Sequence, residues 1–313
     1  MGNLRMVSII NLHGIERRDK GHMESSLLTK KKVYRLDGVD AIVKYTTGQK
    51  EYLYMEEVTD QYDNIIYKLE YNKEGQPEIQ IDALYKGEKI IQQKVTNLFE
   101  ETDETIDFEY DENQRLLREY IHYTNERVLH QSYEYDQTGN LTTIIYYHDG
   151  EEHSRDCSSY DDKGNNIIRE QYDKDGELLE AETFEYNDNG EIIKIMFAYS
   201  EYDEQIDEYK HHKKTRLNKY DQNNRLISEV YLDENYSLNY TYDEKGRVSE
   251  TSRFENERVV ERHIKKYDTD DHIIEEKFIS DIDNTSSSSF SAYYGGSAER
   301  NESYLLRYEY DNI

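Results

Sequence analysis

The sequence has no tryptophan, one proline and one cysteine among its 313 residues. The lone Cys157 excludes an internal disulfide framework and suits a reducing compartment. The lone Pro77 leaves nearly every backbone amide able to donate in a sheet. No apolar run is long enough to span a membrane, and residues 6–12 are too short for the core of a signal peptide. We therefore expect a cytoplasmic protein.

Basic residues are also scarce: 39 Lys and Arg face 68 Asp and Glu, which gives a formal net charge of −29 at pH 7. Such a field repels nucleic-acid phosphates and anionic membranes, and it attracts basic proteins. Two interpretations stay open. The acids only keep a long sheet soluble and protect its edges, or they form a binding surface for a basic partner.

Tyrosine, with 32 copies, is the abundant aromatic residue, and it recurs before turn residues. In the stretch YEYDQTGNLTTIIYYHDGEE, residues 133–152, Tyr135 is followed by Asp136 and Gly139. An Asp that opens a turn accepts a bond from its own backbone two residues on, and Gly tolerates positive φ. The alternation of side chains that follows is typical of a strand. The stretch therefore predicts a β-hairpin.

The same turn returns along the chain at steps of roughly 11–14 residues, or about two strands every 25 residues. The closing position of the turn is the one that Gly139 occupies, four residues after the tyrosine. Asp271 is acceptable there because Asp tolerates positive φ, whereas Gln114 fits the turn pattern poorly. The predicted structural turn residues are Gly75, Gly139, Gly164, Gly176, Gly190, Asn224 and Gly246.

This spacing predicts an all-β fold, an elongated and twisted antiparallel sheet of tandem hairpins that is able to curl. A mean hydropathy of −1.07 with 34% charged residues is otherwise typical of disorder. The periodic Tyr, Ile and Leu indicate instead a sheet with one buried and one polar face. Each unit would contact mainly its neighbours, so we expect residues 23–313 to form a single repeat domain.

The repeated units, Tyr-Asp-x-x-Gly followed by Asn, Arg or Glu and then an aliphatic residue, resemble the YD repeats of the RHS family. The resemblance is clearest over residues 105–275 and weaker over 34–104. It implies a relation to proteins that build β-sheet shells around toxins or act at cell surfaces. This chain departs from that pattern, since it is a short form with no visible toxin domain and no export signal.

The two ends do not follow the repeat. Residues 1–22 form a leader or a vector-derived remnant, since Gly21-His22-Met23 resembles a cloning junction and makes Met23 a candidate natural start. Residues 284–298 are low in complexity and predict a flexible loop. A final strand is expected from Tyr304 onward.

No motif for catalysis occurs in the sequence, and we expect no catalytic residue, metal or cofactor. The Asp173–Gly176 turn resembles a calcium loop but lacks the distal bidentate Glu. His211 and His212 are adjacent, so on a strand they would point to opposite faces. Cys157 has no recognisable base partner and is expected to be a strand residue.

Charge and tyrosine therefore carry the functional interpretation. We expect a non-catalytic protein that binds a basic protein partner, most concretely an immunity or antitoxin protein against a toxin of bacterial competition. A carbohydrate- or surface-binding repeat module is the alternative, with tyrosines stacking on sugar rings. The candidate partner-binding residues are Glu119, Tyr120, Tyr146, Glu170, Glu180, Glu182 and Tyr231.

Overall fold

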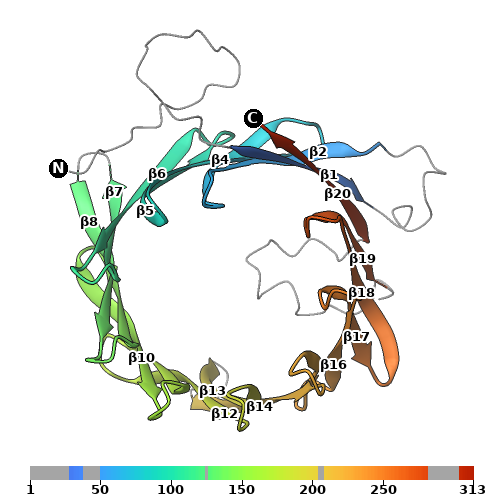
Figure 1. Cartoon of the computed structure of the whole chain (residues 1–313). Helices are drawn as coiled ribbons and strands as arrows, with labels where there is room; N and C mark the ends of the chain where they lie inside the picture. Colours follow the sequence, from blue (N-terminus) through green and yellow to red (C-terminus); the bar gives the residue numbers. More distant parts are fainter. Residues whose placement is uncertain (1–27, 38–49, 124–125, 204–207, 281–302) are drawn as a thin grey trace. The chain divides into compact units, whose positions relative to one another are not determined.

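The computed structural model describes residues 28–37, 50–123, 126–203, 208–280 and 303–313, and all regular structure in these ranges is β-strand (Figure 1). The expectations for residues 1–22 and 284–298 lie outside these ranges. None of the described segments forms a helix long and apolar enough to cross a membrane.

The described residues form twenty strands, and every recorded register is antiparallel. The predicted all-β meander of hairpins is therefore confirmed. The strands are β1 (Thr29–Asp37), β2 (Tyr52–Thr59), β3 (Ile65–Tyr71), β4 (Pro77–Lys86), β5 (Lys89–Asn97), β6 (Thr102–Tyr110), β7 (Leu116–Tyr123), β8 (Glu126–Tyr135), β9 (Leu141–His148), β10 (Glu151–Tyr160), β11 (Asn166–Asp173), β12 (Leu178–Tyr186), β13 (Ile192–Asp203), β14 (Glu208–Tyr220), β15 (Leu226–Tyr231), β16 (Tyr236–Tyr242), β17 (Val248–Glu255), β18 (Arg258–Tyr267), β19 (Ile273–Ser280) and β20 (Tyr304–Asn312).

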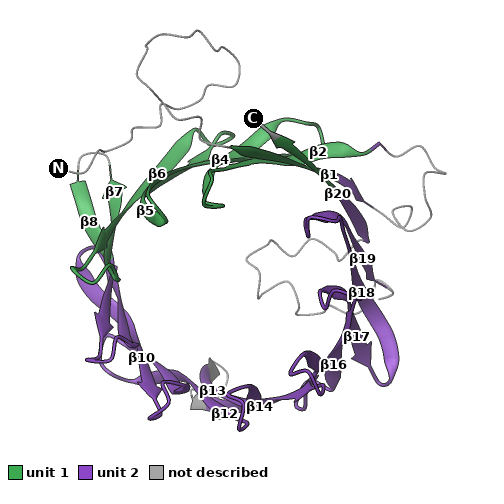
Figure 2. Cartoon of the chain, in the orientation of Figure 1, with its two compact units in different colours: residues 1–34, 51–130, 308–313 green, residues 35–50, 131–307 purple. Residues whose placement is uncertain are grey.

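The chain divides into two compact units (Figure 2). Unit 1 comprises residues 1–34, 51–130 and 308–313, and unit 2 comprises residues 35–50 and 131–307. In unit 1, β2 pairs with β1 and β3, and the strands through β7 then pair in chain order. In unit 2, pairing in chain order runs from the end of β8 to the start of β20. Each unit is thus a meander of neighbouring strands.

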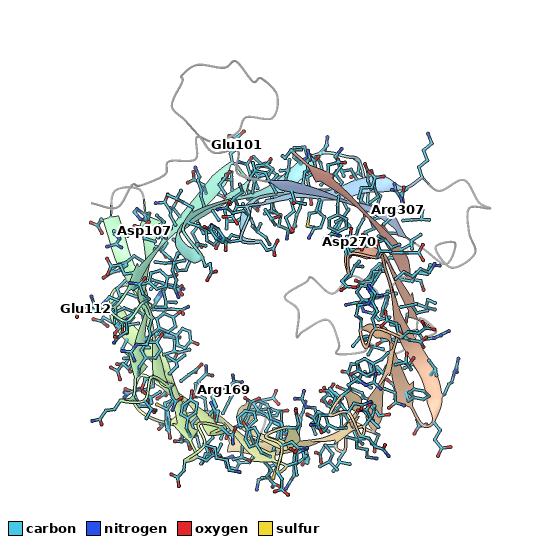
Figure 3. All side chains as sticks on the ribbon, viewed as in Figure 1. Glu101, Asp107, Glu112, Arg169, Asp270 and Arg307 are labelled. Carbon is cyan, nitrogen blue, oxygen red and sulfur yellow. The ribbon has the colours of Figure 1, made fainter. Side chains whose placement is uncertain are left out.

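Neither face of the sheet forms a conventional apolar core. The buried hydrophobic side chains of the described residues are Val33, Leu36, Val58, Ile121 and Leu305. Most strand residues are half-buried on both faces, and side chains stand on both sides of the ribbon in each unit (Figure 3). The expectation of one buried and one polar face is therefore wrong. Side chains in a single layer pack sideways on cross-strand neighbours, and these pairs stabilise the sheet.

The turn after Tyr135 shows how the repeated motif closes a hairpin. The amide of Gly139 donates to the Asp136 carbonyl oxygen at 3.1 Å, and the amide of Asp136 donates to the Asn140 carbonyl oxygen at 2.9 Å. The Asp136 carboxylate accepts the amides of Thr138 and Asn140, both at 2.9 Å. The pairing register shifts at Tyr135, which absorbs the extra turn residue as a bulge.

Positive φ recurs at the closing position of these turns. Gly139 has φ 95°, while Asn224 and Asp271 take the same region at 59° and 69°. Gln114 also lies there, at φ 65°, and its amide donates to the Asp111 carbonyl oxygen at 3.0 Å. The expectation that Gln114 is an exception is wrong, because the hydrogen bonds of the Asp111 turn tolerate a side chain at this position. The remaining predicted turn residues, all with positive φ, are Gly75, Gly164, Gly176, Gly190 and Gly246.

The tyrosine before six of these turns ties its strand to the preceding one. The Tyr160 hydroxyl at the end of β10 donates to the Leu141 carbonyl oxygen at the start of β9, at 2.6 Å. Because β9 and β10 are joined by a turn at their other ends, this bond closes the open end of the hairpin. The same bond occurs in Tyr110 to Ile90, Tyr186 to Asn166, Tyr220 to Ile192, Tyr242 to Leu226 and Tyr267 to Val248.

Candidate functional site

One edge of unit 2 carries a series of nearly identical turns, which we call the Asp edge. Its turns are residues 136–140, 161–165, 187–191, 221–225, 243–247 and 268–272. They share an edge because each joins an even-numbered strand to the next strand of the meander. Consecutive turns also touch: the Asn189 side-chain amide donates to the Asn224 Oδ1 at 3.0 Å, and Lys245 Nζ lies 2.8 Å from Asp271 Oδ1.

The residue that opens each Asp-edge turn is engaged by the turn itself. The pKa of Asp136 falls to about 2, chiefly because the Thr138 hydroxyl donates to its carboxylate. The pKa of Asp243 also lies below its ordinary value, chiefly because the Arg247 side chain donates to it. These carboxylates accept hydrogen bonds that favour the ionised form. They are structural groups and are not available to a partner.

The next residue in three of these turns is an acid that the turn does not use. Asp162, Asp188 and Glu244 are exposed, and they make no hydrogen bond or ion pair with other described residues. We call these three the turn acids. Neighbouring hairpins repeat after two strands, so consecutive Asp-edge turns lie roughly 10 Å apart. The turn acids therefore form a spaced row of free carboxylates.

Sequence analysis missed the turn acids, although a signal was present. In Asp161-Asp162, Asn187-Asp188 and Asp243-Glu244, the acid directly follows the residue that caps the turn. The first member has its oxygen directed to backbone amides two and four residues on, as in Asp161. The second member has no such amide within reach. Turn chemistry alone could therefore have separated the structural acid from the free one.

The candidate residues chosen from the sequence do not share one face. Glu119 and Tyr120 lie in unit 1, side by side on β7, and Glu119 pairs with Phe108 while Tyr120 pairs with Asp107. Adjacent strand residues point to opposite faces, so these two are separated by the sheet.

In unit 2 the same alternation splits the remaining candidates. Glu180 and Glu182 on β12 pair with Gln171 and Arg169, whereas Glu170 on β11 pairs with Ala181 and so lies on the other face. The face with Glu180 and Glu182, which we call the aromatic face, also carries Tyr146 and Tyr231, as the registers show. The other side of unit 2 is called the opposite face.

Most of these candidates already have partners within the chain. Tyr146 donates to Asp156 Oδ2 at 3.0 Å, and Glu182 pairs with Arg169. Tyr120 lies under the Arg127 guanidinium, 3.7 Å from its ring centroid. Glu180, in contrast, is exposed and makes no ion pair with another described residue. Of the two candidate acids on the aromatic face, Glu180 is therefore the one whose charge is open to an external group.

Tyr231 belongs to a cluster of tyrosine and arginine side chains on the aromatic face. Its ring stacks on Tyr236 with 4.3 Å between centroids, and the Arg253 guanidinium lies 4.4 Å from the Tyr236 centroid. Tyr240 donates to Glu229 Oε2 at 2.7 Å. Burial is the largest cause that raises the pKa of both Tyr236 and Tyr240. Both phenols therefore stay protonated at neutral pH and act as a rigid aromatic platform.

The described groups that could bind a metal or act as a nucleophile are engaged in the local structure or disfavoured by it. Ligand atoms of Asp268, Asp270 and His272 lie within 4.8 Å of one another, but the Asp268 carboxylate already accepts the amides of the other two at 2.9 Å. Burial raises the pKa of the Cys157 thiol, which disfavours the reactive thiolate. His211 pairs with Ser200 and His212 pairs with Tyr199, so the two histidines lie on opposite faces of β14.

Comparison with known proteins gives likenesses to solved structures only. No family model matches the chain, and no curated protein matches its sequence. The crystal structure of TcdB2-TccC3-TEV matches with 10% identity and a TM-score of 0.29, over 81% of this chain and 19% of that chain. TcdB2-TccC3 matches with 11% identity and a TM-score of 0.28, over 80% of this chain and again 19% of that one.

A porin-like protein from Bacteroides uniformis matches with 9% identity and a TM-score of 0.34, over 91% of this chain and 97% of that chain. The chain thus spans about a fifth of the TcdB2-TccC3 chains and nearly all of the porin-like protein. These scores are too low to carry an argument about function.

Proposed function

We propose that this chain is a non-catalytic binding protein for a basic protein, and most concretely an immunity or neutralising protein for a toxin. The observation that carries the proposal is the row of free turn acids in a chain of net charge −29. The turn acids, Asp162, Asp188 and Glu244, are exposed and make no hydrogen bond or ion pair with other described residues, since the neighbouring capping residue accepts the backbone amides of the turn.

The geometry of the Asp edge supports a protein partner over a single ion. The turn acids stand on the second, third and fifth turns of the Asp edge, so neighbouring carboxylates lie roughly 10 and 20 Å apart. They are too widely spaced to coordinate one cation, whose oxygen ligands lie within about 2.6 Å of the metal. They match lysine and arginine side chains spread over a protein surface. Electrostatic complementarity of this kind raises the association rate and orients the partner.

The aromatic face supplies a second component. Glu180 is exposed on this face, and the Tyr231–Tyr236 stack presents aromatic surface on the same side of the sheet. Rigid aromatic side chains contribute contact area at low entropic cost. Glu182 would have to exchange Arg169 for an external cation, so we expect it to contribute less than Glu180.

The proposal that the partner is a toxin rests on the YD-like turns. Proteins with such repeats often belong to systems of bacterial competition, and this is an association of families rather than a property of the site. Toxins that act on nucleic acid present basic surfaces, and an acidic binder would mask them. Catalysis by this chain is not part of the proposal.

Co-purification from the native cell, with mass spectrometry of the retained protein, tests the proposal. We expect a basic partner whose release rises as salt is added, because screening weakens contacts between exposed charges. An acidic partner, or retention that does not respond to salt, would overturn it.

A further inference from the structure

Strand β14 is basic in an otherwise acidic chain. Residues 208–220, EYKHHKKTRLNKY, hold five Lys and Arg residues, two His residues and one acid. The strand pairs with β13 over residues 208–217 and with β15 over residues 216–220. Its side chains alternate between the two faces of the sheet, so a ligand that uses their charges contacts one face at a time.

The cations on the aromatic face of β14 are compensated. Lys214 Nζ lies 2.6 Å from Glu234 Oε1, and Arg216 lies 3.3 Å from Glu229 Oε1. Arg216 also donates to the Tyr231 hydroxyl at 3.4 Å. These ion pairs link Lys214 and Arg216 on β14 to acids on β15 and in the turn that follows it.

The cations on the opposite face are not compensated. Lys213 and Lys219 are exposed, and neither makes a hydrogen bond or ion pair with another described residue. The cross-strand neighbours of Lys213 are Ala198 and then Ala181, so no acid lies beside it in the row. The first acid of that row is Glu170, three strands and roughly 14 Å away.

His211 extends this cationic strip. It lies two residues from Lys213, on the same face, and its Nδ1 is 2.8 Å from the Ser200 hydroxyl. From Lys213 to Lys219 the strand rises roughly 20 Å. We define the β14 strip as His211, Lys213 and Lys219. From His211 to Lys219 the strip spans roughly 26 Å, the length of an extended peptide of about eight residues.

We propose that the β14 strip binds the carboxylates of a short acidic peptide segment of another protein. The small side chains of Ala198 and Ala181 leave room for a peptide backbone beside Lys213. The positive charges of the two lysines complement the carboxylates of the peptide. A long polyanion such as nucleic acid is disfavoured because it would run over the surrounding acids. This site is separate from the turn acids and does not depend on them.

Fluorescence anisotropy at low ionic strength, with a labelled peptide of alternating Glu and Ser, tests the site on the full chain. The variant Lys213→Gln with Lys219→Gln should weaken binding roughly tenfold, and the two Lys→Arg changes should restore it. The matched control, Lys163→Gln with Lys174→Gln, removes the same charge from exposed turn lysines and should leave binding unchanged. Thermal unfolding of all variants checks that the sheet is intact.

Four results would overturn the proposal. Two are the absence of peptide binding and an equal loss of binding in the control variant. The third is displacement of the peptide by inorganic phosphate as efficiently as by unlabelled peptide, which would assign the strip to phosphate groups. The fourth is a loss of binding on reversal of the turn acids alone, which would place the peptide elsewhere.

Discussion

The hydroxyl of Tyr242, at the end of β16, donates to the backbone carbonyl oxygen of Leu226, at the start of β15, across 2.7 Å. The Tyr242 ring also lies beside a cation from the adjacent turn, since the Arg225 guanidinium is 4.8 Å from its centroid. One side chain thus joins two strands and a turn. This relationship recurs at Tyr267, which donates to Val248 and lies 4.3 Å from Arg247.

Removing this hydroxyl should destabilise unit 2. We expect Tyr242→Phe to lower the free energy of unfolding by about 0.5–1.5 kcal/mol, the usual net value of one such hydrogen bond. Urea unfolding measures the change. Tyr62→Phe is the control, because the Tyr62 side chain is 52% exposed and should tolerate the change. Equal effects of the two variants would mean that the recurring bond contributes nothing to stability.

Valine at the closing position of a turn should be costly for backbone reasons alone. Gly246 has φ 82°, and a Cβ placed there would meet no atom within 4 Å. Gly246→Val should therefore destabilise by about 1–3 kcal/mol through strain at positive φ, without any clash.

Asn at this position should cost much less, because Asn224 has φ 59° in the equivalent turn. Gly246→Asn and Asn224→Gly are the paired controls, and thermal unfolding of the three variants compares them. The same loss in Gly246→Val and Gly246→Asn would contradict the turn assignment. Gly139→Val and Gly164→Val should repeat the large effect.

The Asp136 turn should contribute stability that depends on pH. The pKa of Asp136 is about 2 in the folded chain, below the ordinary value of roughly 3.9 in an unfolded one. A lowered folded pKa means that the contribution is complete above pH 4 and is lost as pH falls toward 2. Urea unfolding at pH values across this window measures the loss.

Asp136→Asn isolates this effect, since Asn187 occupies the same position in a neighbouring turn and accepts the same two backbone amides. The stability gap between the native chain and Asp136→Asn should be largest above pH 4 and should narrow toward pH 2. A gap that stays constant across the window would show that the carboxylate is not selectively stabilised.

Reversal of the turn acids should weaken binding of the basic partner without unfolding the sheet. We expect Asp162→Lys, Asp188→Lys and Glu244→Lys together to slow association several-fold at low salt, with a smaller change in dissociation. Surface plasmon resonance with the co-purified partner measures both rates. Glu112→Lys is a comparison on an equivalent turn of unit 1. If neither the triple variant nor Glu112→Lys changes the association rate, the acids serve only to keep the protein soluble.

The strand order was predictable because the turn residues mark each reversal of the chain. Tyr-Asp-x-x-Gly specifies the cap, the left-handed position and the start of the next strand within a few residues. Gln114 shows the limit of that reasoning, since the hydrogen bonds of its turn impose positive φ on a residue that does not favour it.

The face of each side chain was less accessible from the sequence. A bulge at each turn tyrosine, such as the register shift between Glu134 and Tyr135, changes the alternation between strands. One residue of offset moves a side chain to the other face. The choice of both Glu170 and Glu182 for one surface therefore could not be checked without the pairing of β11 with β12. Ion pairs between residues distant in sequence could not be predicted either, because they also depend on the pairing of the strands.

The tyrosine bonds that close the hairpins also bear on how the chain folds. In each case the donor and acceptor are near in sequence: Tyr160 and Leu141 are 19 residues apart, and the turn between them is shorter still. Contacts of low sequence separation are reached quickly, and no single hairpin needs a distant strand to begin. Folding of each unit can therefore nucleate at any one of several equivalent hairpins and spread to its neighbours. A mutation that prevents one turn from forming should then change the order in which the hairpins form more than it lowers the overall folding rate.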